Sequence, residues 1–254
     1  MPKRDATPPG APCWIDLMTS DPAASKAFYG ELLGWTSEDS GPEYGGYITF
    51  RKDDALVAGA MANDPAQGVP DGWSVYLATD DAEATSEAVT AAGGTVVVPT
   101  MAVGELGKML VVVDPSGASI GAWQPGTHPG FGLVDDPGAP AWFELHTRDY
   151  AGAIAFYEKA FGWETEVASD TDDFRYTTLG KGDDQAAGVM DAANFLPEGV
   201  PSRWTVYFRT ADADADVAKA VELGATVVEP VEDTPYGRLA GLNDPTGAYF
   251  KLVG

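Results

Sequence analysis

The chain has 254 residues, of which 44% are hydrophobic and 11% aromatic, and this length and composition suit two globular domains. Its 39 acidic and 15 basic residues give a formal net charge of −24, which repels nucleic-acid phosphates and anionic lipid headgroups. Because no apolar run reaches the roughly 18 residues of a membrane span, we expect a cytoplasmic protein that binds neither nucleic acid nor membranes.

Two features near the N-terminus support that expectation. Residues 1–10, MPKRDATPPG, contain no hydrophobic signal core and are predicted to form a disordered arm. Cys13 is the single cysteine of the chain, so no internal disulfide requires an oxidising compartment.

The first predicted domain spans 11–124 and consists of two similar modules, 11–62 and 72–124. Each module opens with a short alternating segment that contains a tryptophan, Trp14 or Trp73, and continues into a helix. Asp21 and Asp80 lie seven residues after these tryptophans, where an aspartate is predicted to cap the helix N-terminus. Strand-like segments follow each helix, and the turn sequence DPSG (114–117) precedes the last strand.

A Gly- and Pro-rich stretch, 125–138, is predicted to link this domain to a second one, and His128 within it is expected to lie in solvent. The second domain, 139–254, repeats the first. Residues 139–163 match 11–35 at an offset of 128, GWSVYLAT (72–79) aligns with RWTVYFRT (203–210), and VVDPSGASI (112–120) aligns with LNDPTGAYF (242–250). The modules of the second domain are therefore 139–191 and 203–254.

The predicted fold class is α+β, with each module ordered as one strand, one helix and three strands. A unit of this order, with Phe-Tyr inside the helix, glycine after it and Asp-Pro-x-Gly before the last strand, resembles the vicinal oxygen chelate superfamily of glyoxalases, bleomycin-resistance proteins and extradiol dioxygenases. The resemblance implies four βαβββ modules paired into two tandem glyoxalase-like domains with curled, half-open barrel sheets. It also implies a monomer in which the fused domains form a pseudo-dimer.

The positions that hold the metal in metal-dependent members of that superfamily carry unusual residues here. Carried over residue by residue, the resemblance places these positions at Trp14, Trp73 and Gly121 in the first domain and at Trp142, Trp204 and Lys251 in the second. Indole has no available lone pair, glycine has no side chain, and lysine is cationic near neutral pH. The sequence therefore predicts no metal site and no cofactor.

The candidate site lies in the second domain. If Trp142 faces the cavity that the superfamily encloses, alternation along the strand places Glu144 and His146 on the same face. Glu144 and His146 are the candidate catalytic pair, because an imidazole titrates near neutrality and suits proton transfer. The candidate ligand-binding residues are Trp142, Trp204, Tyr249 and Lys251 in this domain and Trp14, Asp16 and Trp73 in the first, where Met18 stands in place of His146.

Each assignment has a structural alternative. The tryptophans could fill the core, His146 could be a satisfied buried histidine, and Lys251 could form an ion pair with Glu144. Three functions stay open, and whether the protein is an enzyme is one of the open points. The first is cofactor-free acid–base chemistry, of lyase or hydroxylase type, on a small apolar or aromatic molecule. The second is sequestration of such a molecule, as in bleomycin resistance, and the third is a non-catalytic interaction or stress protein.

Overall fold

The protein, seen in a computed structural model that describes residues 7–64, 66 and 68–254, contains the four predicted βαβββ modules. The first domain contains β1 (Pro12–Thr19), α1 (Pro22–Leu33), β2 (Thr36–Asp39), η1 (Pro42–Tyr44), β3 (Ile48–Lys52), β4 (Ala55–Ala62), β5 (Gly72–Ala78), α2 (Ala82–Ala91), β6 (Thr95–Val103), β7 (Gly107–Val113) and β8 (Ser119–Pro125). The second contains β9 (Pro140–Thr147), α3 (Tyr150–Phe161), β10 (Thr165–Asp170), β11 (Arg175–Leu179), η3 (Gly182–Asp184), β12 (Ala187–Asp191), β13 (Arg203–Arg209), α4 (Ala213–Glu222), β14 (Thr226–Thr234), β15 (Gly237–Asn243) and β16 (Tyr249–Val253).

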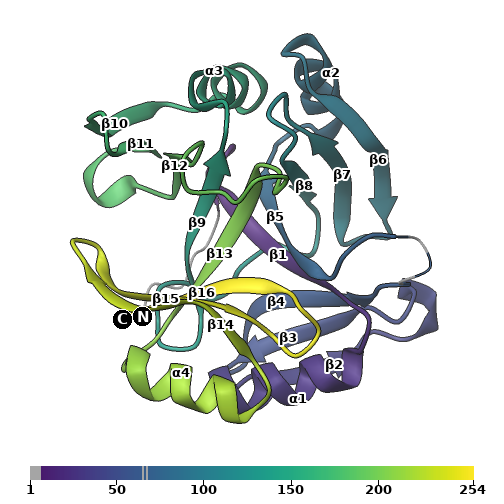
Figure 1. Cartoon of the computed structure of the whole chain (residues 1–254). Coiled ribbons are helices and arrows are strands. Elements are labelled where there is room, and N and C mark those ends of the chain that lie inside the picture. The colour runs from purple at the N-terminus through teal and green to yellow at the C-terminus, as the bar shows by residue number, and fades with distance from the viewer. Residues whose placement is uncertain (1–6, 65, 67) are drawn as a thin grey trace.

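Each domain forms one eight-stranded mixed sheet. The strand orders are β2-β3-β4-β1-β5-β8-β7-β6 and β10-β11-β12-β9-β13-β16-β15-β14, so the two modules of a domain meet where their first strands pair antiparallel. Figure 1 shows the outer strands curling away from these central pairs, which lie back to back in the middle of the molecule. The predicted fold class is confirmed.

The helices begin and end where local chemistry predicts, with one correction. The side chains of Asp21 and Asp149 accept hydrogen bonds from the backbone of the first turns of α1 and α3. Both helices stop at a glycine with positive φ, a conformation that costs glycine little. In α2 the cap is Asp81, so the prediction of Asp80 is wrong by one residue, and α4 begins in the same way at Asp212.

The repeated Phe-Tyr pair and the repeated Asp-Pro-x-Gly turn contact one another across the domain boundary. Helices α1 and α4 lie together at one end of the molecule, and α2 and α3 lie together at the other (Figure 1). Tyr29 of α1 donates its hydroxyl to Asp244 of the second domain at 2.9 Å, and Tyr157 of α3 donates to Asp114 of the first at 3.1 Å. Each domain therefore supplies part of the other's buried core, as in the predicted pseudo-dimer.

The segments before the two domains are more ordered than predicted. Of the predicted arm, residues 1–6 lie outside the described residues, but Gly10 is buried and its backbone N–H donates to the carbonyl of Ala78 at 2.8 Å. In the linker, Phe131 is buried and its N–H donates to the carbonyl of Cys13 at 2.8 Å. The linker therefore packs along the first domain as fixed structure.

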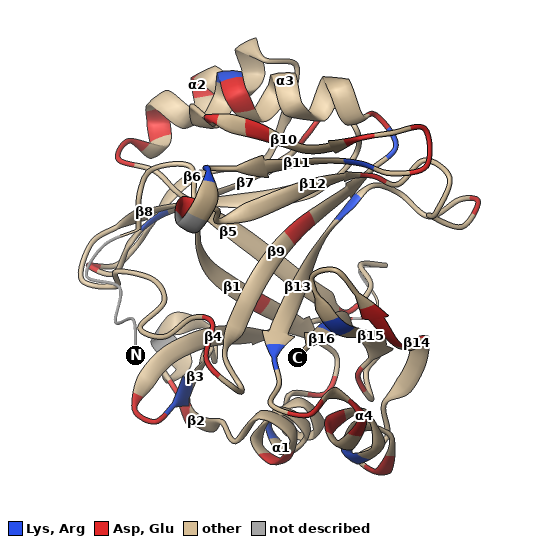
Figure 2. Cartoon of the chain, turned by 90° about the vertical axis from the view of Figure 1, so that its left-hand side faces the viewer, with Lys and Arg blue, Asp and Glu red and all other residues tan. Residues whose placement is uncertain are grey.

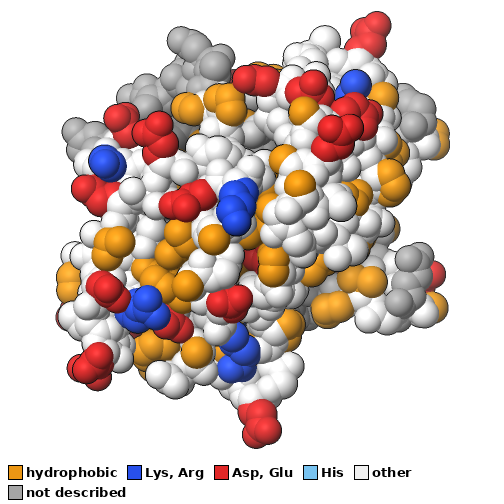
Figure 3. Space-filling model, turned by 90° about the horizontal axis from the view of Figure 1, so that it is seen from above, with side chains coloured by type: hydrophobic (Ala, Val, Ile, Leu, Met, Phe, Trp, Pro, Cys, Tyr) orange, Lys and Arg blue, Asp and Glu red, His pale blue; other side chains and the backbone are white. Residues whose placement is uncertain are grey.

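The charge is spread over the surface. Figure 2 shows acidic residues on the outer helices and turns, and Figure 3 shows them dispersed over the face seen from above. Among the described helices, none combines the length and apolar character needed to cross a membrane.

Candidate functional site

The strand β9 carries the candidate catalytic pair at the centre of the second sheet. It pairs with β12 on one side and β13 on the other, so its residues are held by backbone hydrogen bonds along both edges. Trp142, Glu144 and His146 share the face turned away from the helices, which we call the inner face. Glu144 and His146 are both buried, and the predicted alternation brings them together.

Glu144 is the centre of a hydrogen-bond cluster. One carboxylate oxygen, Oε1, lies 2.5 Å from His146 Nε2 and accepts the Tyr207 hydroxyl at 2.7 Å, while Oε2 accepts the Tyr176 hydroxyl at 2.6 Å. Tyr176 in turn accepts the indole N–H of Trp142 at 2.8 Å. Three side chains, from β9, β11 and β13, thus converge on one carboxylate, and Trp142 supports one of them.

These contacts set the protonation of the cluster. Burial alone would raise the pKa of Glu144, but the hydrogen bond and charge of His146, with the two tyrosine hydroxyls, outweigh burial and lower the pKa to about 2. Burial and the adjacent Glu144 charge raise the pKa values of Tyr176 and Tyr207 well above their usual value. At neutral pH Glu144 is therefore a carboxylate surrounded by donors.

A glycine makes room for this arrangement. Gly188 on β12 lies directly beside Glu144, and a Cβ added there would lie only 1.9 Å from the Tyr176 hydroxyl oxygen. In the first domain Gly59 has the same relation to Tyr47, whose hydroxyl would lie 1.8 Å from such a Cβ. The side chains of Tyr47 and Tyr176 therefore each pass over a glycine of the neighbouring strand to reach a carboxylate on the central strand.

The first domain contains a simpler version of the cluster. Asp16 Oδ1 accepts the Tyr47 hydroxyl at 2.6 Å and the Trp14 indole at 3.0 Å. Burial raises the pKa of Asp16 against the lowering effect of these hydrogen bonds, because no imidazole stands beside it. Met18 replaces the histidine, and no carboxylate–imidazole pair forms here.

The linker covers this first cluster. His128 was expected in solvent, but its ring lies edge-on to Trp14 with centroids 4.5 Å apart and is half-buried. Its Nδ1 accepts the backbone N–H of Gly130 at 3.0 Å, and burial lowers its pKa. Phe131 contacts Trp14 from the same segment, with centroids 5.7 Å apart. The expectation for His128 is wrong, because the linker folds back onto the first domain.

Two of the predicted ligand-binding residues lie on the other face of their sheets. Trp73 pairs with Leu17 and Trp204 with Leu145, and paired residues of antiparallel strands project to the same face, here the one beneath the helices. The Trp73 indole donates to the Tyr29 hydroxyl at 3.0 Å, and the Trp204 indole to Tyr157 at 2.8 Å. The prediction that these tryptophans face the site is wrong; they belong to the interdomain core.

Tyr249 and Lys251 do lie beside the inner face, but with a different partner from the expected one. Lys251 Nζ lies 2.8 Å from Glu229 Oε2, and the Tyr249 hydroxyl donates to Glu229 Oε1 at 2.7 Å. Lys251 therefore pairs with Glu229 of β14, and the predicted alternative of a pair with Glu144 is wrong.

Sequence reasoning missed the two tyrosines that hold Glu144, together with Glu229. Tyr207 could have been found, because Tyr76 occupies the matching place in the aligned segments 72–79 and 203–210. Tyr176 had only a weaker signal, because the first module of each domain contains a tyrosine in a strand-like segment. Glu229 had none, because β14 is largely exposed and rich in acidic residues.

The residues at the superfamily's metal positions do not fit a divalent metal. Trp73 and Trp204 point into the helix-side core, Lys251 is paired, and a Cβ on Gly121 would lie 2.2 Å from the ring of Tyr76, which fills that space. The carboxylates beside these positions are already engaged, since Glu144 accepts three hydrogen bonds and Asp16 accepts two. Across the described part of the chain, no three His, Cys, Asp or Glu residues are grouped to hold an ion.

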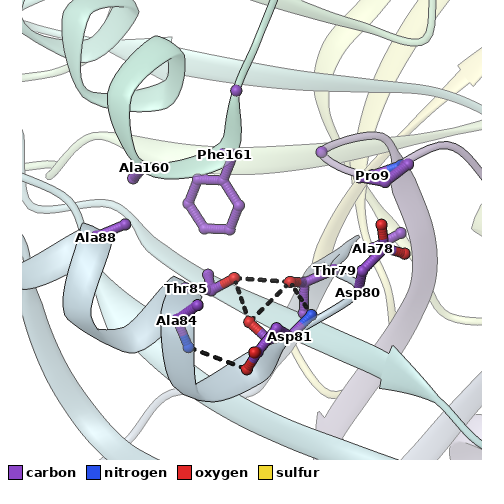
Figure 4. Close-up of a pocket in the computed structure, with 12 residues that line it drawn as sticks. Pro9, Ala78, Thr79, Asp80, Asp81, Ala84, Thr85, Ala88, Ala160 and Phe161 are labelled. Atoms are coloured by element: carbon purple, nitrogen blue, oxygen red, sulfur yellow. Dashed lines mark hydrogen bonds between the residues drawn. The ribbon is translucent and has the colours of Figure 1, made fainter.

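A separate cavity of about 310 Å³ lies between the domains, beside the N-terminus of α2 (Figure 4). Its polar groups serve the helix: the Thr79 and Thr85 hydroxyls lie 2.7 Å apart, and Asp81 caps the first turn. The remaining lining is largely apolar, with Phe161 and Ala160 opposite. The chemistry of the chain therefore gathers at Glu144 and not at this cavity.

Comparison with known proteins agrees with this architecture. A family model described as "Glyoxalase/Bleomycin resistance protein/Dioxygenase superfamily" matches residues 13–121, and one described as "Glyoxalase-like domain" matches residues 142–253. The Mycobacterium tuberculosis protein named "Putative glyoxylase CFP32" is 37% identical over 258 residues, covering 100% of this chain and 98% of the relative. The "Anthracycline biosynthesis protein DnrV" of Streptomyces peucetius is 38% identical over 262 residues, covering 96% and 93%.

Solved structures show the same fold at low sequence identity. The Mn(II)-bound glyoxalase from Novosphingobium aromaticivorans superimposes with a TM-score of 0.66 at 17% identity, covering 96% of this chain and 81% of that one. The 2,3-dioxygenase LapB from Pseudomonas sp. KL28 gives a TM-score of 0.65 at 15% identity, with coverages of 96% and 91%. Two relatives match this chain over nearly their whole length, and a family model matches each half of it. The chain therefore belongs to the glyoxalase/bleomycin resistance protein/dioxygenase superfamily and carries two glyoxalase-like domains in tandem.

Proposed function

We propose that the second domain binds a small, largely aromatic molecule on its inner face and catalyses a metal-independent proton transfer on it. The observation that carries this proposal is the buried Glu144–His146 pair, joined at 2.5 Å and fixed by two tyrosine hydroxyls. We further propose that the protein works as a cytoplasmic monomer.

The two members of the pair have different roles in this proposal. Glu144, with a pKa of about 2, is a weak base at neutral pH and its oxygens are already engaged, so it acts as a positioning residue. It holds the imidazole of His146 in one orientation and stabilises the imidazolium that forms on protonation. His146 Nδ1 has no hydrogen-bond partner among the described residues, which leaves it for the ligand.

The reaction class follows from what the cluster can do without a co-reactant. His146 removes a proton from one atom of the ligand and returns it to another, so that atoms and electrons balance within the ligand. An isomerisation next to a carbonyl group is the simplest case, because the adjacent C–H is acidic enough for an imidazole base.

An aromatic ligand is supported by the surroundings of the pair and by two relatives. Trp142, Tyr176 and Tyr207 adjoin Glu144, and Phe174 stacks on Tyr176 with ring centroids 5.6 Å apart. Flat apolar ligands gain contact area on such rings. Relatives from Streptomyces peucetius and Streptomyces sp. are named anthracycline biosynthesis proteins, and anthracyclines are planar aromatic molecules.

Sequestration of the same ligand is the second candidate function. It is favoured by the aromatic residues alone, since binding needs no proton transfer. The two candidates differ in what becomes of the ligand: an enzyme releases a changed molecule, whereas a sequestering protein releases the same one.

The test uses three variants and an anthracyclinone probe. We expect His146→Ala to abolish turnover of the probe, detected by chromatography, while Glu144→Gln slows it and Met18→Ala in the first domain changes neither turnover nor affinity. Met18 is the matched control because it occupies the place of His146 in the first domain.

Two outcomes would contradict the proposal. Wild type and His146→Ala could both bind the probe tightly and release it unchanged. That result would contradict catalysis and favour sequestration as the function. Loss of probe affinity in Met18→Ala, with the second-domain variants losing only stability, would move the site to the first domain.

A further inference from the structure

Two polar side chains on β13 have buried atoms without a partner. Arg203 Nε and Thr205 Oγ1 are both buried, and neither has a hydrogen bond to any described residue. Thr205 is only 1% exposed, and it pairs across the strands with Glu144, while Arg203 pairs with His146. Both therefore lie on the inner face, directly beside the proposed catalytic pair.

A guanidinium without an ion-pair partner is unusual in this chain, because its 39 acidic residues far outnumber its 15 basic ones. Other arginines show the ordinary pattern: Arg175, Arg209 and Arg238 each form an ion pair with a carboxylate. Arg203 instead lies over the ring of Tyr249, with Cζ 4.1 Å from the centroid, and forms no ion pair with a described residue.

The two carboxylates near this face are engaged by other groups. Glu144 accepts from His146, Tyr176 and Tyr207, and Glu229 is held by Lys251 and Tyr249. The contact with the Tyr249 ring holds the Arg203 guanidinium in place without using its N–H donors. A planar fork of free donors, partly desolvated, suits an acceptor that comes from outside the chain.

We propose that Arg203 and Thr205 bind a carboxylate of the ligand, so that the substrate class is aromatic carboxylic acids. Guanidinium and carboxylate match as two parallel N–H···O hydrogen bonds, and the Thr205 hydroxyl donates a further one. The first domain lacks this feature, since the aligned residues are Gly72 and Ser74. The inference rests on the proposed function, because it uses the same inner face.

The experiment compares two probes that differ in charge, 2-naphthoate and the neutral 2-naphthamide, by calorimetry at neutral pH. We expect wild type to bind 2-naphthoate about tenfold more tightly, the order expected for one charge-assisted pair. Arg203→Gln should abolish that preference while still binding the amide. Arg209→Gln is the matched control, because Arg209 lies on the same strand but is paired with Asp135 at 2.9 Å.

A second variant separates ligand binding from folding. Thr205→Val removes a buried hydroxyl that has no partner, so we expect its melting temperature to rise while its affinity for 2-naphthoate falls. A residue with a purely structural role would not combine a gain in stability with a loss of affinity.

The outcomes separate this inference from the proposed function. Equal affinities for both probes in wild type, or an unchanged preference in Arg203→Gln, would overturn the carboxylate site while leaving aromatic binding intact. Failure of both probes to bind would overturn the inference and remove the support for an aromatic ligand. Unchanged affinity for 2-naphthoate in Thr205→Val would remove Thr205 from the site.

Discussion

Replacing Glu144 by glutamine tests whether the cluster is held by charge or by shape. The substitution keeps the size of the side chain and one carbonyl oxygen, but it removes the negative charge that His146, Tyr176 and Tyr207 contact. Glu144 is 7% exposed, so solvent screens these contacts little. We expect Glu144→Gln to be destabilised at neutral pH.

The magnitude follows from the pKa of Glu144. Its fall from the ordinary 4.5 to about 2 means that the folded protein favours the carboxylate by about 3 kcal/mol. Dividing this free energy by the unfolding entropy of a chain of 254 residues gives a melting temperature that is lower by roughly 6 °C in Glu144→Gln.

The pH dependence has a definite sign. Because the pKa is lowered on folding, the stabilisation is fully present above 4.5 and is lost as the pH falls toward about 2. The difference in unfolding free energy between wild type and Glu144→Gln should therefore fall by about half between pH 7 and pH 3. Urea titrations of both proteins at the two pH values measure it.

Asp16→Asn in the first domain is the control. Burial raises the pKa of Asp16, so its charge destabilises the fold as the pH rises above 3.8, and its removal should be neutral or stabilising at neutral pH. Both donors reach Oδ1, which asparagine keeps. Equal losses in Glu144→Gln and Asp16→Asn, or a Glu144→Gln loss that does not change with pH, would refute the electrostatic reasoning.

The remaining predictions concern packing, the domain interface, metal content and assembly. Gly188→Ala should lower the free energy of unfolding by about 1–3 kcal/mol because the added Cβ displaces Tyr176, whereas Gly72→Ala, whose added Cβ meets nothing within 4 Å, should lower it much less. Urea unfolding compares the two variants, and equal losses would show that Gly188 is not needed to make room for Tyr176. Tyr157→Phe and Tyr29→Phe should each lose about 1–3 kcal/mol, because each strands a buried indole N–H and an aspartate oxygen; a calorimetric scan in which either variant melts like wild type would count against the interdomain bonds. Elemental analysis should find no stoichiometric transition metal and chelators should leave the melting temperature unchanged; one zinc, iron, nickel or manganese per domain would contradict this. Light scattering should give the 26.6 kDa mass of one chain, and twice that mass would disprove the monomer.

The fold could be predicted from the sequence because its signals are local and repeated. The offset between 11–35 and 139–163 shows the duplication, and Asp21 with Gly34 marks the two ends of a helix. Period-two alternation was also enough to place Glu144 and His146 on one face of β9, since that inference needs only the geometry of a single strand.

What could not be predicted depends on pairing between strands. Trp204 opens β13 as Trp142 opens β9, but antiparallel register places Trp204 opposite Leu145 and so on the helix side. Tyr176 reaches Glu144 from a different strand, over a glycine of a third. The bond from Tyr176 to Glu144 joins residues 32 apart in the chain, and the amino-acid pattern of a single strand determines neither the register nor the direction in which a tyrosine crosses a sheet.

The reciprocal bonds from Tyr29 to Asp244 and from Tyr157 to Asp114 bear on the evolution of the chain. In a homodimer of identical halves, every substitution appears at both symmetry-related places, so a change that improves one site alters the other equally. Once the halves are joined, each place has its own codon. Both copies can keep the tyrosine–aspartate bond that joins the domains, while the two copies differ at other places. The second copy has His146 where the first has Met18, and it has Arg203 where the first has Gly72. Covalent fusion thus lets each half of this chain change its own site while the tyrosine–aspartate bonds continue to join the two domains.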